Sequence, residues 1–268
     1  VTRTGSGSGR VTSDPPGIDC GVDCSQAYAP GTAVTLTATP SAGHQFCGWY
    51  GGCSGTGVCA LTVSARHQVE ARFAAGHCDA TIGAVRNGDW NNPRTWSVGR
   101  VPNQDDSVEI PAGVTVSAPP EPVTVQTLYQ DGILQSARNA PLQLRASNTL
   151  SNTGAIRGQT GGNTIGATCG AAGSDVILRG GTLRNTGVIQ GGAGRGGSCC
   201  GGAGGAVALS FGVVDNSGQV LGGAGGSVIC CATSTPGKGG SVTILSGDPA
   251  AGLKSTGDFI GGRIAGED

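Results

Sequence analysis

One pattern recurs four times in the second half of the chain, and it constrains the fold more than any other feature of the sequence. Each copy has an apolar residue two positions before an asparagine. The asparagine is followed directly by Thr or Ser and then by Gly, and a second apolar residue lies four positions after the asparagine. The copies are residues 150–158, 183–191, 214–222 and 253–261, with Ser255 replacing the asparagine in the last. The asparagine positions lie 33, 31 and 39 residues apart. Self-similarity at this period is typical of stacked repeats.

A second apolar stretch precedes each copy, at residues 142–144, 175–178, 206–209 and 241–245. Each repeat is therefore predicted to form a strand, a tight turn, a strand and a glycine-rich excursion. One repeat cannot bury its alternating apolar residues, but stacked repeats can, because each strand pairs with its equivalent in the next repeat. The sequence thus predicts an all-β chain whose residues 76–268 form a short right-handed parallel β-helix. An antiparallel sandwich is the rival fold, but it does not explain why the same turn recurs.

The turn of the repeat carries two specific residue types. Stacking would align Asn152, Asn185 and Asn216 in an amide ladder. The glycine that follows is expected to supply the bend by adopting a positive φ. Glycine accounts for 52 of the 268 residues, and its backbone entropy must be offset by a repeating, hydrogen-bonded backbone.

Five cysteines lie in the glycine-rich excursions and recur in register, so disulfides between neighbouring repeats are expected. They are Cys169, Cys199, Cys200, Cys230 and Cys231. Since five is odd, one thiol would be left free or would bond another chain.

The first 75 residues form a separate predicted β module. Strands are expected at residues 34–39, 60–64 and 69–73, where β-branched or alternating residues occur. Phe46 and Trp49 are the large residues nearby and are expected to fill the small core. The alanines and glycine at 74–76 mark the boundary.

This module resembles the internalin-type B-repeat family, a divergent bacterial repeat. The resemblance rests on residues 9–13, 17–21 and 31–36, and on Gly48 and Trp49 followed by Cys53 and Cys59. It implies a small β-grasp-like spacer of secreted and surface proteins, in which Cys20–Cys24 and Cys53–Cys59 each clamp a loop. Cys47 and Cys78 are extra to that pattern, and we expect them to pair with each other.

Residues 79–117 are predicted to cap the β-helix. Gly88, Asp89, Trp90 and Trp96, with the stretches at 101–106 and 110–114, resemble the eight-glycine domain and the glycine-rich β-helix proteins of bacteria. Members of that family include proteins that bind or process glycans, but we carry over the fold alone. Trp90 and Trp96 are candidates for stacking on a sugar or for covering the open end of the first coil, and we favour the cap.

Asp105 and Asp106 offer calcium ligands in principle. No further acidic cluster surrounds them in the sequence. We therefore expect polar turn residues.

Composition excludes several classes of protein. The net charge of −1 does not provide the basic surface that nucleic acid requires, and no apolar stretch is long enough to cross a bilayer. Eleven cysteines without metal-binding spacing indicate disulfides in an oxidising compartment. We expect a secreted or cell-surface bacterial protein, and the start at Val1 suggests a mature form whose export signal has been removed.

No catalytic centre, metal or cofactor is predicted. Between residues 132 and 257 the acids are Asp175, Asp215 and Asp248, and no histidine follows His77, so neither paired carboxylates nor a histidine base is apparent. We expect an adhesive or structural scaffold of the bacterial surface or matrix that self-associates through β-helix stacking and disulfides, with fibres as one form of assembly. The alternative is a glycan-binding or polysaccharide-cleaving β-helix, with surface glycans as partners.

Overall fold

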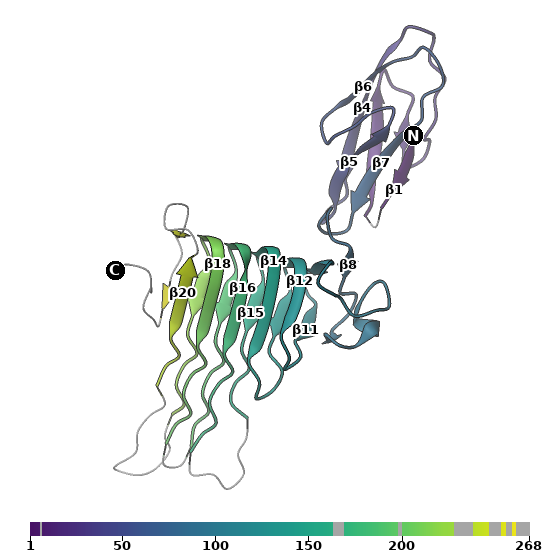
Figure 1. Cartoon of the computed structure of the whole chain (residues 1–268). Coiled ribbons are helices and arrows are strands. Elements are labelled where there is room, and N and C mark those ends of the chain that lie inside the picture. The colour runs from purple at the N-terminus through teal and green to yellow at the C-terminus, as the bar shows by residue number, and fades with distance from the viewer. Residues whose placement is uncertain are drawn as a thin grey trace. The chain divides into compact units, whose positions relative to one another are not determined.

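The computed structural model describes residues 1–5, 7–162, 169–197, 200–227, 238–246, 253–255 and 259–260. The chain divides into two compact units, Val1–Asp79 and Ala80–Asp268 (Figure 1). Among the described residues there is no α-helix, and one 3₁₀ turn occurs at Pro93–Thr95. The all-β class is therefore confirmed. The first unit extends four residues beyond the predicted boundary, and a disulfide from Cys78 to Cys47 attaches this extension to it.

The first unit contains two small sheets. One has the order β1 (Thr2–Thr4), β7 (Val69–Ala74) and β5 (Gln45–Gly51). The other has the order β3 (Asp19–Cys20), β2 (Gly9–Asp14), β4 (Ala33–Pro40) and β6 (Cys59–Thr62). Pairing is antiparallel except between β1 and β7. The core includes the alternating residues Val11, Leu36, Ala71 and Phe73, as expected for half-buried strands.

Strand β5 was not predicted, because glycines interrupt its sequence. In the structure Gly48 adopts a φ of 131°, and the register with β7 shifts between Phe46 and Gly48. Such a bulge re-aims the residues that follow it. Trp49 is buried and donates its indole N–H to the Gly57 carbonyl at 2.7 Å, while Phe46 is half-buried and packs edge-on against it.

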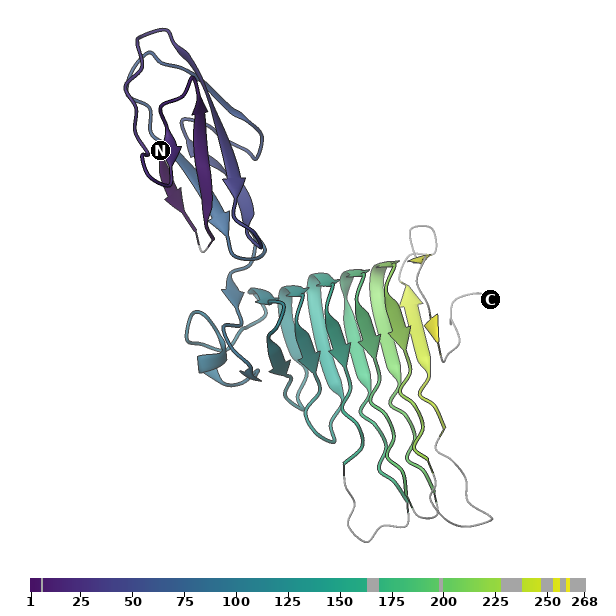
Figure 2. The same cartoon turned by 180° about the vertical axis from the view of Figure 1, so that it is seen from behind.

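The second unit contains two parallel sheets over its described residues, and the chain passes alternately from one to the other (Figures 1 and 2). The eight-stranded sheet is formed by β8 (Ile82–Gly83), β10 (Ser107–Ile110), β12 (Val123–Gln130), β14 (Leu142–Asn152), β16 (Val176–Asn185), β18 (Val207–Asn216), β20 (Val242–Ser246) and β21 (Leu253–Ser255). The seven-stranded sheet is formed by β9 (Gly88–Asp89), β11 (Thr115–Ser117), β13 (Ile133–Gln135), β15 (Ala155–Arg157), β17 (Val188–Gln190), β19 (Gln219–Leu221) and β22 (Phe259–Ile260). Because the pairing is parallel, the antiparallel sandwich is wrong for this unit.

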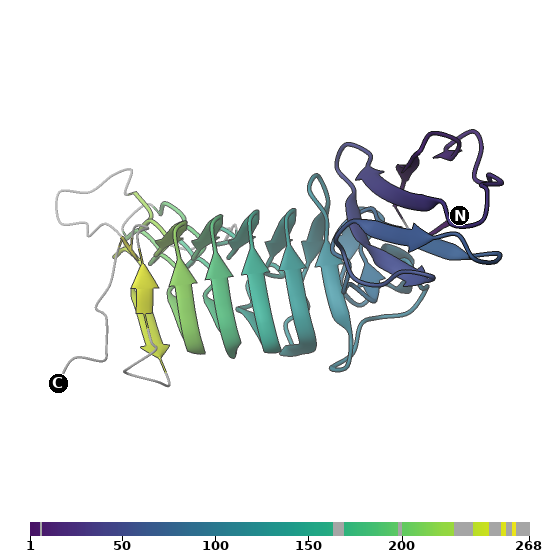
Figure 3. The same cartoon turned by 90° about the horizontal axis from the view of Figure 1, so that it is seen from above.

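We use the word rung for one repeat of the second unit. A rung consists of one strand of each sheet, the turn that joins the two strands, and the excursion that follows. Equivalent residues of successive rungs pair directly, and Figure 3 shows the strands lying side by side. One column of inward residues in the eight-stranded sheet is Leu128, Leu150, Leu183 and Val214, all fully buried. In the seven-stranded sheet Leu134, Ile156, Ile189 and Val220 form the equivalent column. The core is thus built from one apolar residue per rung at each level.

Two details of the repeat differ from prediction. The preceding strand and the segment that ends in asparagine form one continuous strand, as in Val176–Asn185. The glycine of the turn does not adopt a positive φ at Gly154, Gly187 or Gly218. It is required for space instead, because a Cβ on Gly187 would lie 2.2 Å from the carbonyl oxygen of Gly154 in the preceding rung.

The glycine-rich excursions are ordered by hydrogen bonds that change direction along the chain. Outgoing segments (158–162, 191–197, 222–227) leave the seven-stranded sheet, and return segments (169–175, 200–206, 238–241) lead back to the eight-stranded sheet. The amides of Gly194 and Gly197 donate to the next outgoing segment, and that of Gly191 donates to Leu221 directly before it. Those of Gly192 and Arg195 donate to the preceding return segment. This three-residue period is typical of polyproline II helices.

Close approach explains the glycines of these segments. A Cβ on Gly192 would lie 1.9 Å from the Gln159 carbonyl oxygen, and one on Gly191 would lie 2.0 Å from that of Gly205. Every third position is different: Ala193 and Ala203 carry a side chain and are at least partly exposed. The excursions therefore form two hydrogen-bonded layers with glycine between them and small side chains outside.

Candidate functional site

The asparagines of the repeat form a buried polar column. Asn152 donates from Nδ2 to Oδ1 of Asn185 at 2.6 Å, and Asn185 donates in the same way to Asn216 at 2.6 Å. All three side chains are at most 1% exposed. The amides thus satisfy one another inside the core, where an unpaired amide is costly. Ser255 occupies the next register position.

Gln130 extends this column by one rung and was missed from the sequence. It pairs in register with Asn152 and is fully buried. Its Nε2 donates to the Ala155 carbonyl at 3.3 Å. Oε1 of Gln130 and Oδ1 of Asn152 are buried without a hydrogen-bond partner in the described residues. The rung that contains β12 lacks the Asn-Thr-Gly signature, so only the register reveals Gln130.

Trp90 and Trp96 lie in the hydrophobic core of the second unit. Each is 2% exposed, and their rings meet edge-on with centroids 4.9 Å apart. The Trp96 indole N–H donates to the Trp90 carbonyl at 2.7 Å. Neither ring face is therefore open for stacking on a sugar.

Asp106 is the centre of a small polar cluster beside the first strands of the second unit. Both of its carboxylate oxygens accept from Arg100, at 2.6 and 2.7 Å, and the Asn103 amide donates to it at 2.8 Å. Hydrogen bonding from Arg100 holds the pKa of Asp106 below its usual range. Arg100 thus supplies the positive charge that a calcium ion would have supplied, and Asp105 is exposed in the adjoining turn.

The acids considered for glycan cleavage are not brought together. Asp175 precedes the first residue of β16 and Asp215 lies near the end of β18, eight residues beyond the position paired with Val176. At about 3.3 Å per residue the two are roughly 30 Å apart along the strands, whereas glycosidases need carboxylates within about 10 Å. Asp248 lies outside the described residues.

Two shallow hollows adjoin each other on the second unit. One has a volume of about 410 Å³ and is lined by Asp89, Asn91, Ser117, Arg138 and Gln159, among others. The other has a volume of about 300 Å³ and is lined by Arg138, Gln159, Thr160, Gly161, Gly162 and Arg195. Trp90, which the sequence analysis considered for sugar stacking, also lines the larger hollow. The polar side chains of the two linings were not singled out from the sequence, because strand and excursion bring them together.

Four disulfides occur in the described residues. In the first unit they join Cys20 to Cys24, Cys47 to Cys78 and Cys53 to Cys59. In the second unit Cys169 joins Cys200 across two successive return segments, 31 residues apart. Cys199, Cys230 and Cys231 lie outside the described residues.

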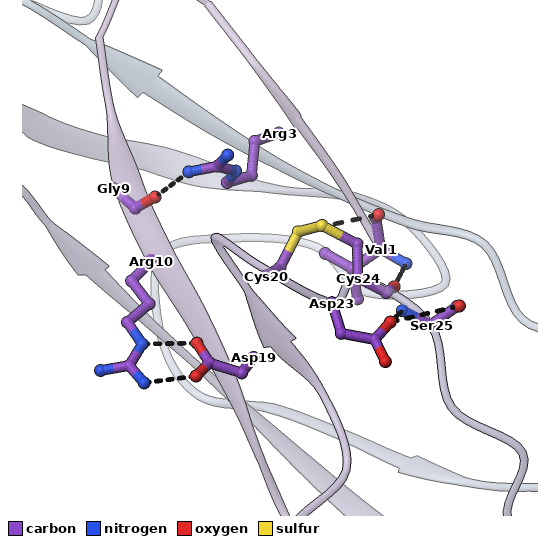
Figure 4. Close-up of a disulfide and its surroundings, with 9 residues drawn as sticks. All are labelled: Val1, Arg3, Gly9, Arg10, Asp19, Cys20, Asp23, Cys24 and Ser25. Atoms are coloured by element: carbon purple, nitrogen blue, oxygen red, sulfur yellow. Dashed lines mark hydrogen bonds and ion pairs between the residues drawn. A yellow bond between two sulfur atoms is a disulfide. The ribbon is translucent and has the colours of Figure 1, made fainter.

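The Cys20–Cys24 disulfide closes a loop against the amino end of the chain (Figure 4). The amino group of Val1 donates to the Cys24 carbonyl at 2.7 Å, and Arg10 pairs with Asp19 beside the loop. This unit also contains a hollow of about 660 Å³, lined by apolar side chains such as Leu36 and Leu61 together with Tyr28 and His67.

Residues 1–77 match the family model of the divergent InlB B-repeat domain. The B-repeat match agrees with the resemblance seen in the sequence and covers nearly all of the first unit, including the cysteines at 20, 24, 47, 53 and 59. No curated protein and no solved structure matches the chain.

Among the residues that the structure describes, no helix has the length and apolar character needed to cross a bilayer.

Proposed function

We propose that the protein is a structural or adhesive scaffold of a bacterial surface or extracellular matrix. In this proposal residues 1–79 are a B-repeat spacer, residues 80–268 are a right-handed parallel β-helix, and residues up to about 117 cap it. The observation that carries the proposal is the in-register pairing of successive rungs, with apolar and asparagine columns running through them. A stack of this kind is a rigid element whose stability comes from contacts between neighbouring rungs.

Two general rules support the handedness and the cap. A connection between parallel strands of one sheet is right-handed in about 98% of cases. The buried pair Trp90 and Trp96 belongs to the same hydrophobic core as Ile82 and Val116 of the first rungs. Aromatic side chains at this place hide the end of the core from water.

Secretion is supported by the disulfides of both units, since such bonds persist in oxidising compartments. The B-repeat match agrees with a surface location.

Self-association is supported by three features. In the described part of the chain β20 is an end strand of the main path of the eight-stranded sheet, and an end strand can pair with another chain. The net charge of −1 gives little repulsion between copies. Finally, eleven cysteines are an odd number, so at least one per chain is available for a bond between chains.

Electron microscopy and sedimentation of the full chain test the scaffold proposal. We expect filaments or large oligomers that shorten in the triple variant Cys199→Ser, Cys230→Ser, Cys231→Ser if disulfides link the copies. A wild-type protein that stays monomeric at high concentration and binds neither cells nor matrix would refute the proposal. Release of reducing or unsaturated sugar ends from polysaccharides would instead favour the cleaving alternative.

A further inference from the structure

Two arginines are direct neighbours on the outward face of the eight-stranded sheet. Arg145 of β14 pairs in register with Arg179 of β16, and the two strands lie side by side (Figure 1). Both arginines are exposed, and each follows a buried leucine, Leu144 or Leu178, so both side chains point away from the core. Neighbouring strands are about 4.8 Å apart, and the two guanidinium groups therefore share one patch of surface.

The described residues do not neutralise the charge of this arginine pair. Neither guanidinium group forms a hydrogen bond or an ion pair with another described residue, and like charges directly opposite on neighbouring strands repel each other. Arg184 differs, because its register partner in β18 is Asp215. Asp175 is about 13 Å from Arg179 along the chain, and its carboxylate already accepts from the Ala206 amide at 2.7 Å.

The strands on either side add a hydroxyl group at the same level. The register continues from Arg145 to Thr124 of β12, and from Arg179 to Ser210 of β18. Thr124 is exposed, Ser210 is half-buried, and buried residues flank both, as on the two central strands. The outward column is therefore Thr, Arg, Arg and Ser, with hydrogen-bond donors on four adjacent strands.

We propose that the arginine pair binds the dianionic phosphate group of inorganic phosphate or of a phosphomonoester. A guanidinium group is a planar fork that donates two parallel hydrogen bonds to an oxyanion. At neutral pH a phosphomonoester has nearly two negative charges and three terminal oxygens, which suits two forks that share one oxygen. A phosphodiester has one charge and two terminal oxygens, so the backbone of a nucleic acid fits the pair less well.

The same phosphate group occurs free in solution and, as a phosphomonoester, in the headgroup of phosphatidic acid. Its binding does not depend on self-association. A monomeric chain that binds phosphate would count against the scaffold and leave this site intact, whereas filaments that bind no phosphate would count against this site alone.

Isothermal titration of the full chain with inorganic phosphate tests the site, at about pH 8, where phosphate has lost its second proton. A titration with sodium chloride at the same ionic strength controls for screening of the two charges. We expect saturable binding of phosphate and none of chloride. Arg145→Gln and Arg179→Gln should each bind phosphate about tenfold more weakly, since each removes one charge-assisted pair of hydrogen bonds.

Two more variants separate the arginine pair from the general charge of the sheet. Arg145→Lys keeps the charge but loses the fork, so it should bind phosphate more weakly than the wild type. Arg184→Gln is the matched control, because it removes an exposed arginine whose register partner is an acid, and it should bind phosphate like the wild type. The thermal unfolding of every variant should match the wild type, which separates loss of the site from loss of the fold.

Cosedimentation with vesicles distinguishes the sources of the phosphate group. A lipid source predicts that the wild type sediments with phosphatidylcholine vesicles containing phosphatidic acid, and not with phosphatidylcholine alone. A soluble source predicts binding of glycerol phosphate without cosedimentation, and in both cases each arginine of the pair is required. The proposal is overturned if none of these phosphates binds, if Arg184→Gln weakens binding as much as Arg145→Gln, or if single-stranded DNA competes as well as glycerol phosphate.

Discussion

The glycines between the two excursion layers allow a specific test, because their role is steric. Gly192 is the position to change, and Gly239 serves as the control. Gly192 lies in an outgoing segment between two neighbours. Its amide donates to Ser174 at 2.8 Å, and its carbonyl accepts from Gly205 at 2.7 Å. A Cβ added here would lie 1.9 Å from the Gln159 carbonyl oxygen. The contacted atom is backbone, so Gly192→Ala forces the two segments apart.

The expected cost follows from the bonds that this separation breaks. The same Cβ would lie 2.6 Å from the amide nitrogen of Ser174, so the segment must also move away from the return segment, and this movement breaks the hydrogen bond between Gly192 and Ser174. A buried group left without its partner costs about 1–3 kcal/mol, whereas the lower entropy of the unfolded alanine chain returns about 0.4–1 kcal/mol. We expect Gly192→Ala to lower the free energy of unfolding by about 2–5 kcal/mol.

Denaturant unfolding of the second unit, followed by the fluorescence of its buried tryptophans and by circular dichroism, measures this loss. Gly239→Ala is the matched control, because among the described residues its Cβ would meet nothing closer than the Gly223 carbonyl oxygen at 3.7 Å. It should change the free energy of unfolding by less than about 1 kcal/mol. If Gly192→Ala were as stable as Gly239→Ala, glycine would not be required here for close approach.

Three further predictions concern the polar groups and the cysteines. Asn185→Leu should lower the free energy of unfolding by about 2–5 kcal/mol because it removes two buried hydrogen bonds of the column, the one from Asn152 and the one to Asn216. Gln130→Leu removes an unpartnered oxygen and one longer bond, from Nε2 to the Ala155 carbonyl at 3.3 Å, and should cost only about 1 kcal/mol; equal losses in denaturant titrations would contradict the column. Hydrogen bonding from Arg100 lowers the pKa of Asp106 in the folded state. The ionised carboxylate therefore stabilises the fold above its unfolded pKa of about 4, and this stabilisation is lost as the pH falls through the folded pKa. Between about pH 5 and pH 2 the free energy of unfolding of Asp106→Asn should therefore fall less than that of the wild type. Peptide mapping without reduction should recover Cys169 linked to Cys200, and a Cys169–Cys231 link would contradict the register of the return segments.

Much of the second unit could be predicted from local pattern, because each rung repeats the same burial. The Leu150, Leu183 and Val214 positions lie in one column, as the aligned repeats predict. Gln130 was not predicted, because the glutamine occupies the asparagine position without the flanking Thr-Gly signature. Only its pairing with Asn152 in the structure reveals its place in the column. The two hollows were not predicted for a related reason. Arg138 and Arg195 are 57 residues apart in the sequence, and the stacking of rungs brings both into the lining of one hollow.

The excursions show what a glycine-rich sequence can specify when its period is three. Residues 201–206 are Gly-Gly-Ala-Gly-Gly-Ala, and residues 222–227 are Gly-Gly-Ala-Gly-Gly-Ser. In a helix with three residues per turn, such a pattern places the side chain on one face and glycine on the other two. Ala203 and Ala224 are exposed, whereas Gly202 and Gly223 face neighbouring backbone at about 2 Å from an added Cβ. Glycine here lets backbones meet and exchange hydrogen bonds in two directions, so the bonds between segments offset the entropy that glycine loses. A third layer would meet the outward side chains, which explains why the packing stops at two layers.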